Sequence, residues 1–385
     1  MQYRPDRQSD NKLSTLGLGC MRFFRDKSES ERVILTAIER GVNYFDTAYI
    51  YPGSEVLLGG VLDKHGLRDK VYIGTKMPLN MCRRREDFDK YFDEQLRRLK
   101  TDYVDYYFMH SIKDVAQWQN MIDLGIEDWI AEKKANGQIR QIGFSYHGTA
   151  KDFPIIVESY PWQFCMIQYN YYDEHYQAGR AGLELAAERG LTVMIMEPLL
   201  GGRLATGLPK KSRALMQESG IHPVDWALWW LWSHPEISIV VSGMNNVAQL
   251  EQNVQSCDNY RPLSHTERQV IAAVQEDFRS SYKIPCTSCN YCLPCPVGIN
   301  IPSVLSAYNA SFAQNRFTGI KLYAIGTALN SKKPLTPQLC NNCGKCEKIC
   351  PQGIAIRREF RRVRRRLEPL PIKAGAAVLR KIMSR

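Results

Sequence analysis

The sequence has 385 residues, of which 44% are hydrophobic and 24% charged, with a formal net charge of +11 and 12 cysteines. This length allows a sizeable core and is long for a single small domain. No stretch approaches the roughly 20 apolar residues of a membrane span, and the polar N-terminus does not resemble a signal peptide. We therefore expect a cytoplasmic protein with one large α/β domain and an appendage.

Short apolar runs rich in β-branched or aromatic residues alternate with segments of helical period up to about Tyr260. The expected strands are residues 16–21, 44–46, 71–76, 104–109, 141–145, 164–169, 192–196 and 237–242. The expected helices include residues 31–40, 54–64, 86–99, 126–136, 179–189, 223–233 and 247–257. Eight strand and helix units of this kind predict a (β/α)8 TIM barrel. The alternative is a doubly wound sheet, but no G-x-G-x-x-G follows the first strand.

In such a barrel the carboxyl ends of the strands meet at one mouth, where active sites form. Polar side chains stand at six of the predicted strand ends. These side chains are Asp46, Lys76, His110, Ser145, Gln168 and Glu197. The mouth is therefore the predicted active site. Glu197 could either cap its loop or take part in catalysis.

The stretch GVNYFDTAYIY at residues 41–51, then GTK at residues 74–76 and His110, resemble the aldo-keto reductase family. The likeness covers about residues 16–257. The resemblance implies four catalytic residues, which are Asp46, Tyr51, Lys76 and His110. In that family the tyrosine protonates a carbonyl oxygen while hydride arrives at the carbonyl carbon, so the implied substrate is a small carbonyl compound or alcohol.

A phenol has an unperturbed pKa of about 10, and a nearby ammonium lowers that pKa toward the working range. The resemblance implies that Lys76 supplies this charge to Tyr51. It further implies that Asp46 holds Lys76 by a charge-assisted hydrogen bond, and that His110 orients the carbonyl or relays a proton. The structural alternative is an ordinary buried Asp–Lys pair beside a core tyrosine.

The resemblance also implies nicotinamide contacts, of which this sequence keeps only some. Ser145 and Gln168 match the family, but Tyr146 replaces an asparagine. Met196 replaces a stacking tyrosine, and Glu197 stands where the family usually has serine. The resemblance also points to Asn253. Gly202, Ser242 and Gly243 are further predicted cofactor contacts, because they follow the last two strands, where barrels bind phosphate, although an ordinary turn also explains the glycines.

The resemblance also bears on the choice of cofactor. The positions that would clasp a 2'-phosphate are Gly243 and Gln249, and because neither is charged, NAD is favoured over NADP. FMN is a further possibility, with its phosphate near Gly202 and Gly243, because barrels bind phosphate there through backbone N–H groups. Flavin is the usual converter between one-electron and two-electron chemistry.

Two cysteine runs follow the predicted barrel. Thiolates spaced two residues apart can hold one iron–sulfur cube, and in two-cluster ferredoxins the fourth cysteine of each run binds the other cluster. The first predicted 4Fe-4S cluster is held by Cys286, Cys289, Cys292 and Cys350. The second is held by Cys340, Cys343, Cys346 and Cys295. Only two residues separate Cys292 from Cys295, instead of the usual three, which makes Cys295 the least typical ligand. A pair of zinc sites is the alternative.

With the cysteines included, the chain resembles the ferredoxin-containing subgroup of oxidoreductases in the same family. We expect the barrel at residues 1–283, a small ferredoxin-like α+β domain with both clusters at 284–356, and a basic tail at 357–385. The remaining cysteines are expected to be buried inert thiols, and they are Cys20, Cys82, Cys165 and Cys257.

The positive charge is concentrated at the end of the chain. From Pro351 onward there are eleven Lys or Arg and two Glu, a net charge of +9, so the preceding residues are nearly neutral. A solvated tail is the simplest interpretation. The alternative that we carry forward is docking of an acidic redox partner such as ferredoxin. No interleaved aromatic residues support stacking on nucleic-acid bases.

The predicted function is an oxidoreductase that couples carbonyl or alcohol chemistry in the barrel to electron transfer through two 4Fe-4S clusters. The alternative is a non-enzymatic or flavin-dependent electron-transfer adaptor that uses the barrel as a scaffold. The enzyme is favoured because a scaffold needs neither Tyr51 nor Lys76.

Overall fold

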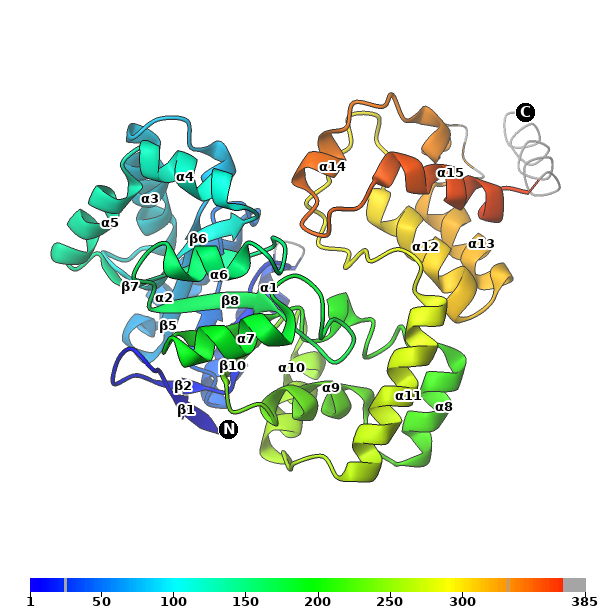
Figure 1. The fold of residues 1–385 in the computed structure, drawn as a ribbon, viewed down its shortest axis with the longest axis horizontal. Helices are drawn as coiled ribbons and strands as arrows, with labels where there is room; N and C mark the ends of the chain where they lie inside the picture. The colour runs from blue at the N-terminus through cyan, green and yellow to red at the C-terminus, as the bar shows by residue number, and fades with distance from the viewer. Residues whose placement is uncertain (24–25, 330, 332, 370–385) are drawn as a thin grey trace. The chain divides into compact units, whose positions relative to one another are not determined.

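The structure is a computed structural model that describes residues 1–23, 26–329, 331 and 333–369 (Figure 1). The chain forms two compact units. The first contains Met1–Leu199 and Val224–Leu263, and the second contains Leu200–Pro223 and the described residues from Ser264 onward. Each unit therefore draws on two separate stretches of sequence. Among the described helices, none combines the length and apolar character needed to cross a bilayer.

The first unit is a closed barrel of eight parallel strands in the order β10-β3-β4-β5-β6-β7-β8-β9. The strands are β3 (Leu16–Gly19), β4 (Tyr44–Asp46), β5 (Tyr72–Met77), β6 (Val104–Ile112), β7 (Ile139–Tyr146), β8 (Phe164–Gln168), β9 (Thr192–Met196) and β10 (Ile237–Ser242). All eight predicted strands are present. The predicted (β/α)8 barrel is therefore confirmed.

Helices follow the strands and surround the barrel (Figure 1). They are α1 (Lys27–Glu39), α2 (Ser54–His65), α3 (Glu86–Leu99), α4 (Val115–Asp123), α5 (Ile126–Ala135), α6 (Phe153–Glu158), α7 (Gly179–Glu188), α9 (Pro223–Trp232) and α10 (Val247–Asp258). Helix α3 illustrates their amphipathic pattern, because Phe88, Phe92 and Leu99 are buried on one face. The sequence did not predict α4 and α6, which are only 9 and 6 residues long.

An N-terminal hairpin precedes the barrel and was not predicted. It consists of β1 (Tyr3–Pro5) and β2 (Lys12–Ser14), which pair antiparallel. Between them the buried Asp6 accepts hydrogen bonds from Tyr106, at 2.7 Å, and from Gln141 and Thr192. These partners lie near the beginnings of β6, β7 and β9, so the hairpin closes the amino-terminal end of the barrel. Strands of three residues carry too little periodic pattern to be recognised in a sequence.

The barrel interior is filled with side chains. Its buried cluster consists of Leu13, Tyr44, Tyr106, Phe108, Phe164, Met166, Met194, Ile239 and Val241, with Tyr72 and Met196 packed against it. A filled interior leaves no channel through the barrel. Chemistry is therefore confined to the carboxyl ends of the strands, as in other barrels of this type.

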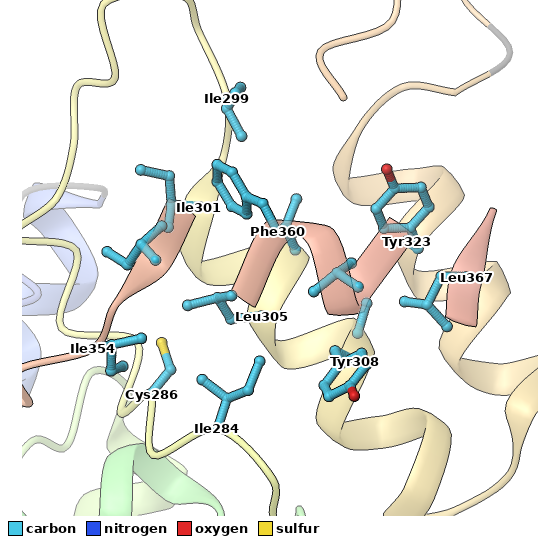
Figure 2. Packing of buried hydrophobic residues seen from close by; sticks show 14 residues of the cluster. Ile284, Cys286, Ile299, Ile301, Leu305, Tyr308, Tyr323, Ile354, Phe360 and Leu367 are labelled. Atoms are coloured by element: carbon cyan, nitrogen blue, oxygen red, sulfur yellow. The ribbon is translucent and has the colours of Figure 1, made fainter. Parts of the chain in front are cut away.

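The second unit is helical around its cysteine loops. Its helices are α8 (Lys210–Glu218), α11 (His265–Ser281), α12 (Ile301–Ala313), α13 (Arg316–Gly326), α14 (Lys345–Ile349) and α15 (Ile356–Leu367). Figure 2 shows the core, in which Leu305 of α12, Tyr323 of α13 and Phe360 of α15 are all buried. Cys286 belongs to the same core, and five further cysteines of the two runs pack against it.

Helix α15 corrects the prediction of a solvated tail from residue 357. Its apolar residues Ile356, Phe360, Val363 and Leu367 recur at helical spacing and are buried in the core of the second unit. Its arginines occupy the other face. There the hydrocarbon parts of long basic side chains can cover apolar surface while the charged groups stay in water. The predicted tail residues 370–385 lie outside the described residues.

The two compact units also divide the chain differently from the predicted boundary at residue 283. Helix α11 lies before that boundary but groups with the second unit, together with the stretch that contains α8. The reason is local packing, because Ser212 of α8 donates from its backbone N–H and its hydroxyl to Asp277 of α11, at 2.9 and 2.6 Å. The long connection after β9 is thus part of the second unit.

Candidate functional site

The four predicted catalytic residues come from three neighbouring strands. Asp46 ends β4, Lys76 is the last residue but one of β5, and His110 lies near the end of β6. Tyr51 follows in the turn after β4. Asp46, Lys76 and His110 are at most 5% exposed, whereas Tyr51 is only partly buried. A buried charged pair beneath a more accessible phenol is the arrangement that an acid catalyst at the mouth requires.

Lys76 is held by its neighbours through all three of its N–H donors. Its Nζ lies 2.7 and 2.6 Å from the two carboxylate oxygens of Asp46 and 2.7 Å from the backbone oxygen of Thr47. Burial lowers the pKa of Lys76 and raises the pKa of Asp46, because both charges lose hydration, and their mutual attraction opposes both shifts. These three contacts hold the Lys76 ammonium beside Asp46.

Tyr51 lies close to both Lys76 and His110. The Lys76 ammonium is 5.4 Å from the centre of the Tyr51 ring, which is within range of a cation–π interaction. The rings of Tyr51 and His110 are 6.1 Å apart in an edge-to-face arrangement. The positive charge of Lys76 therefore lies close to the Tyr51 ring.

His110 is neutral at physiological pH. Burial, reinforced by the nearby charge of Lys76, lowers the pKa of His110 well below its usual value. Burial also lowers the pKa of the neighbouring His147, to about 4. A neutral imidazole can donate or accept a hydrogen bond but is a poor source of a proton. Of the two predicted roles for His110, orientation of a substrate oxygen fits this electrostatic state better.

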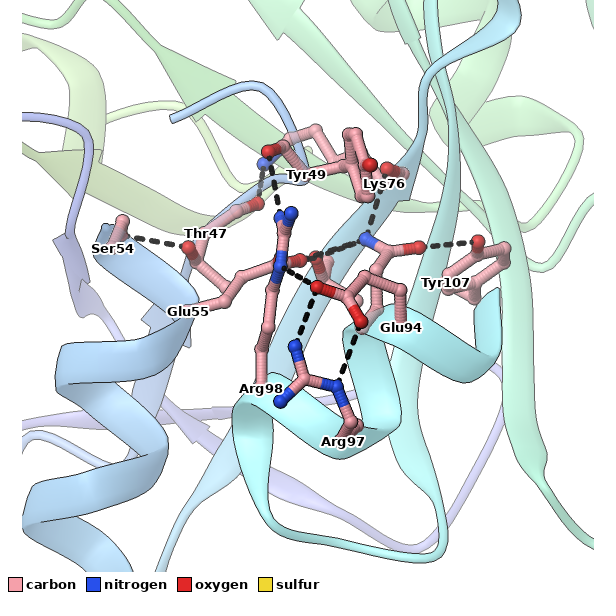
Figure 3. A network of polar contacts seen from close by, with 11 residues as sticks. Thr47, Tyr49, Ser54, Glu55, Lys76, Glu94, Arg97, Arg98 and Tyr107 are labelled. Carbon is pink, nitrogen blue, oxygen red and sulfur yellow. Dashed lines mark hydrogen bonds and ion pairs between the residues drawn. The ribbon is translucent and has the colours of Figure 1, made fainter. Parts of the chain in front are cut away.

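A buried polar network supports Lys76 from the side of α2 and α3, and sequence reasoning missed it (Figure 3). Gln95 donates to Glu55, to Thr75 and to the backbone oxygen of Lys76, at 2.8, 2.8 and 3.1 Å. Glu55, 1% exposed, also accepts from Arg98 at 3.1 Å. The only signal in the sequence is a glutamine on the apolar face of a helix, which by itself does not reveal its partners.

The end of β6 is shaped by one of the predicted cofactor residues. The register of β6 against β7 shifts between Met109 and Ile112, and Ser111 has a left-handed backbone with φ of 58°. The hydroxyl of Ser145 accepts a hydrogen bond from the backbone N–H of Ser111 at 2.8 Å. Irregular backbone of this kind is common beside active sites. Ser145 thus holds the strand end that carries His110.

Gln168, at the end of β8, is anchored by a buried carboxylate. Its amide nitrogen donates to Asp173 at 2.6 Å. Asn170 donates to the backbone oxygen of Glu197 at 3.0 Å, and Glu197 has a φ of 56°, in the left-handed region. Such backbone conformations in residues other than glycine cost about 1–3 kcal/mol and often occur at functional sites. Met196, just before Glu197, packs on the barrel interior.

The residues after β10 form a second group of predicted cofactor contacts. Ser242 donates to the side chain of Asn253 at 3.0 Å, and Asn253 donates to the backbone of Gln249 at 2.7 Å, so both are used to tie β10 to α10. Gly243 is exposed, with no atom near its missing side chain, and it precedes the N-terminus of α10. An accessible backbone before a helix N-terminus fits a phosphate group. Gly202, by contrast, belongs to the second unit.

The structure brings together the four thiols predicted for the first cluster. The sulfur of Cys286 interacts electrostatically with Cys350, and that of Cys292 with Cys289, Cys286 and Cys350. Burial raises the pKa of the Cys286 thiol, which the charge of Arg203 and hydrogen bonds from Ser288 oppose. Cys350, which is 55 or more residues away in sequence, therefore lies with the first run.

The thiols predicted for the second cluster surround one cavity. A cavity of about 190 Å³ is lined by Cys295 together with Cys340, Cys343 and Cys346, and Cys292 borders it as well. Cys346 interacts electrostatically with Cys340 and Cys343. Four cysteine thiolates around one cavity are the ligand set that a 4Fe-4S cluster needs. Among the described residues, no three His, Cys, Asp or Glu side chains are arranged to hold a single metal ion.

The remaining cysteines are buried as predicted. Cys20, Cys82, Cys165 and Cys257 are buried in the first unit. Burial raises the pKa of Cys82 to about 12 and raises the pKa of Cys20 and Cys165 as well. Thiols in this state are poor nucleophiles and poor metal ligands.

The barrel and its polar mouth match a known family, since residues 15–276 fit the family model of the aldo/keto reductases. The chain belongs to the aldo/keto reductase family. Residues 285–362 match the model of a 4Fe-4S dicluster domain. The chain is thus an oxidoreductase of this family that carries an iron–sulfur domain, as the sequence predicted.

Relatives of this aldo/keto reductase include a protein of Bacillus subtilis named uncharacterized oxidoreductase YqkF, which is 25% identical over 71% of the chain and 96% of that protein. A 6-dehydroglucose reductase of Novosphingobium aromaticivorans is 25% identical over 60% of the chain and 81% of its own length. Among solved structures, the holo form of an aldo-keto reductase from Bacillus halodurans superposes with a TM-score of 0.61 and 27% identity. That match covers 71% of this chain and 96% of that one.

Proposed function

We propose that this protein reduces a carbonyl compound, or oxidises the corresponding alcohol, at the mouth of the barrel and exchanges electrons through two 4Fe-4S clusters. The observation that carries the proposal is the placement of Tyr51 above the buried pair of Lys76 and Asp46, beside a neutral His110. Reduction of a carbonyl adds two electrons and two protons. Tyr51 supplies the proton that is added to oxygen.

The roles of the four residues follow from their contacts. The Lys76 charge, fixed by Asp46, stabilises negative charge on the Tyr51 oxygen as the proton leaves. The neutral imidazole of His110 holds the carbonyl oxygen by a hydrogen bond. In the reverse direction the same groups remove the proton from an alcohol.

We propose a nicotinamide cofactor, with NAD favoured over NADP. Gln168 and Met196 end β8 and β9, and Ser145 is the last residue but one of the neighbouring β7, so all three lie at one side of the mouth. Gly243 offers accessible backbone to a phosphate before α10. A nicotinamide supplies hydride when bound, whereas FMN at the same mouth would convert hydride chemistry to single electrons. FMN remains the alternative cofactor. Of the two glycines predicted to contact its phosphate, Gly243 belongs to the barrel unit, whereas Gly202 belongs to the second unit.

The protein partner that we propose is an acidic one-electron carrier such as a ferredoxin. Arg357 lines the cavity of the second cluster, and Arg361 and Arg365 follow it at four-residue spacing along α15. Arg361 and Arg365 are exposed and have no ion-pair partner in the part of the chain that the structure describes, whereas Arg357 pairs with Glu347. A stripe of positive charge that begins at a redox centre accelerates the approach of an acidic carrier. The expected compartment is the reducing cytoplasm.

Reversing two of these charges should slow electron delivery by the acidic carrier. Truncation is a poor test, since it would remove the buried Phe360 and Leu367. We expect Arg361→Glu combined with Arg365→Glu to lower the rate of cluster reduction by ferredoxin about tenfold or more in 0.1 M salt, where charges act over about 10 Å. Stopped-flow absorbance measures the rate. Reduction by dithionite should be unchanged.

The matched control reverses Lys210 and Lys211, which are exposed and change the net charge equally. This control variant should keep most of the wild-type rate. The two rates should also converge in 1 M salt, where charges act over only about 3 Å. Equal slowing by both variants would show that total charge, not the α15 stripe, guides the carrier.

The experiment that tests the proposed function is an anaerobic spectroscopic assay on the purified full chain. We expect about eight irons and eight sulfides per chain, and bleaching of the visible cluster absorbance by dithionite. An alcohol substrate with NAD⁺ should bleach the clusters only where a bound flavin divides the hydride's electron pair into single electrons. Flavin analysis of the same sample separates the two cofactor proposals. Carbonyl turnover without any change in cluster absorbance would reject the coupling. Filled clusters without turnover of any carbonyl in a broad panel would favour the adaptor.

A further inference from the structure

The loop after β9 packs against the first cysteine run in the second unit. Three successive residues in this loop, Leu200, Gly201 and Gly202, have left-handed backbones with φ of 49°, 64° and 88°. A side chain at Gly201 would lie 2.1 Å from the backbone oxygen of Thr287, so only glycine permits this approach. Thr287 follows Cys286 directly. The loop is therefore shaped to reach the first cluster's binding loop.

This approach places Arg203 beside Cys286. The Arg203 guanidinium donates to the hydroxyl of Ser288 at 3.2 Å and lies 5.1 Å from the centre of the Tyr282 ring. Tyr282 in turn donates to the backbone oxygen of Cys286 at 2.5 Å. Arg203 also interacts electrostatically with the Cys286 sulfur, to which Ser288 hydrogen-bonds. Within the described ranges no carboxylate pairs with Arg203, so its charge is not compensated locally.

The second cluster has a different electrostatic environment. Arg357 lies close enough to interact with Cys346 and Cys340, but its guanidinium is forked onto Glu347, at 3.0 and 2.7 Å. The negative charge of Glu347 also acts on Cys346. The arginine at the second cluster is therefore neutralised by a carboxylate that itself lies near a ligand. Lys345 also lines the second cavity, but its side chain is exposed and water and salt screen its charge, whereas Arg203 is partly buried.

Reduction adds one negative charge to a cluster. A nearby uncompensated positive charge, and hydrogen bonds to the ligating sulfur, stabilise the reduced state and raise the reduction potential. We propose that Arg203 sets the cluster of Cys286, Cys289, Cys292 and Cys350 at a higher reduction potential than its neighbour. An electron delivered to the second cluster then moves to the first, which is reduced as the second is reoxidised.

The exposure of the ligands fits this direction. Cys343 is exposed, and its cavity is bordered by Leu293 and Ile349, which are 36% and 41% exposed, whereas Cys286 is buried. The second cluster is thus the one that a soluble carrier can approach. The binding loop of the first cluster, by contrast, packs against the loop after β9. This inference rests on the proposed function for the identity of the two centres and of the carrier, and it adds an order to them.

The test is a redox titration of the reconstituted full chain, followed by electron paramagnetic resonance. We expect two cluster potentials. Arg203→Gln keeps a donor for Ser288 but removes the charge, and it should lower the higher potential by about 59 mV, a tenfold change in the one-electron equilibrium. Arg203→Lys, which keeps the charge, should shift it much less. Glu347→Gln, which leaves Arg357 uncompensated, should raise the lower potential.

Three results would overturn the proposal. They are an unchanged higher potential in Arg203→Gln, a shift of the lower potential in that variant, and equal shifts in Arg203→Gln and Arg203→Lys. Iron content is measured first. If Arg203→Gln holds fewer than eight irons, the test rests on Glu347→Gln alone. A rise of the lower potential in that variant supports the proposal, and a rise of the higher potential contradicts it. The titration needs no carbonyl substrate or carrier. It can therefore fail while the proposed activity holds, or succeed while that activity is absent.

Discussion

Tyr51→Phe should lower kcat/KM for carbonyl reduction by about 10² to 10⁴-fold, the usual contribution of a positioned general acid. The substitution removes the proton donor and almost no volume, so the contacts of Lys76 with Asp46 and Thr47 are kept. Steady-state kinetics under anaerobic conditions measure the loss. Iron content and thermal unfolding of the variant should equal those of the wild type.

Tyr49→Phe provides the matched control, since it makes the same chemical change two residues away. The Tyr49 ring packs on Tyr91 and under the Arg98 guanidinium, at 4.9 and 4.3 Å. This variant should retain nearly full activity. Wild-type turnover by Tyr51→Phe would contradict the proposed acid. Lys76→Met is a less informative variant, because an unpaired buried Asp46 costs about 3–5 kcal/mol of stability.

Cys350→Ala should remove the same cluster as Cys289→Ala and leave about four irons per chain. The expectation follows from the electrostatic contact of Cys350 with Cys286 and Cys292. Alanine is preferred to serine because it provides no ligand atom. The measurement is the electron paramagnetic resonance spectrum of the remaining reduced cluster, together with its iron content.

The comparison is sharpest with a second pair of variants. Cys295→Ala and Cys343→Ala should share one residual spectrum, which differs from the spectrum shared by Cys350→Ala and Cys289→Ala. If the ligands do not cross between the runs, Cys350→Ala will instead match Cys343→Ala. Zinc in place of iron would reject both cluster assignments.

The fold was predictable wherever a local pattern repeated. The eight barrel strands are short apolar runs bounded by polar ends, and the positions of Asp46, Lys76 and His110 at the carboxyl ends predict that they share one site. By contrast, Gln95 and Glu55 are ordinary helix residues in the sequence. Their role in supporting Lys76 depends on packing between α2, α3 and β5, which no local pattern records.

Two further features were hidden for different reasons. In α15 the density of arginines masked an apolar series, Phe360, Val363 and Leu367, that is sufficient to bury one face of the helix. The grouping of the loop after β9 with the second unit depends on contacts far apart in sequence, such as Gly201 with Thr287. Glycine pairs after a barrel strand suggest a phosphate loop, and only the tertiary contact reveals a structural use.

The division of the second unit into two stretches of sequence bears on how the protein is made. Residues 200–223 emerge from the ribosome well before α11 and the cysteines, and they are followed by β10, which the barrel needs for closure. Cys350, the predicted fourth ligand of the first cluster, is synthesised after both β10 and the first cysteine run. Iron–sulfur insertion should therefore be a post-translational step on a chain whose barrel can already have closed, and an interrupted synthesis should yield a folded barrel with empty cysteine loops.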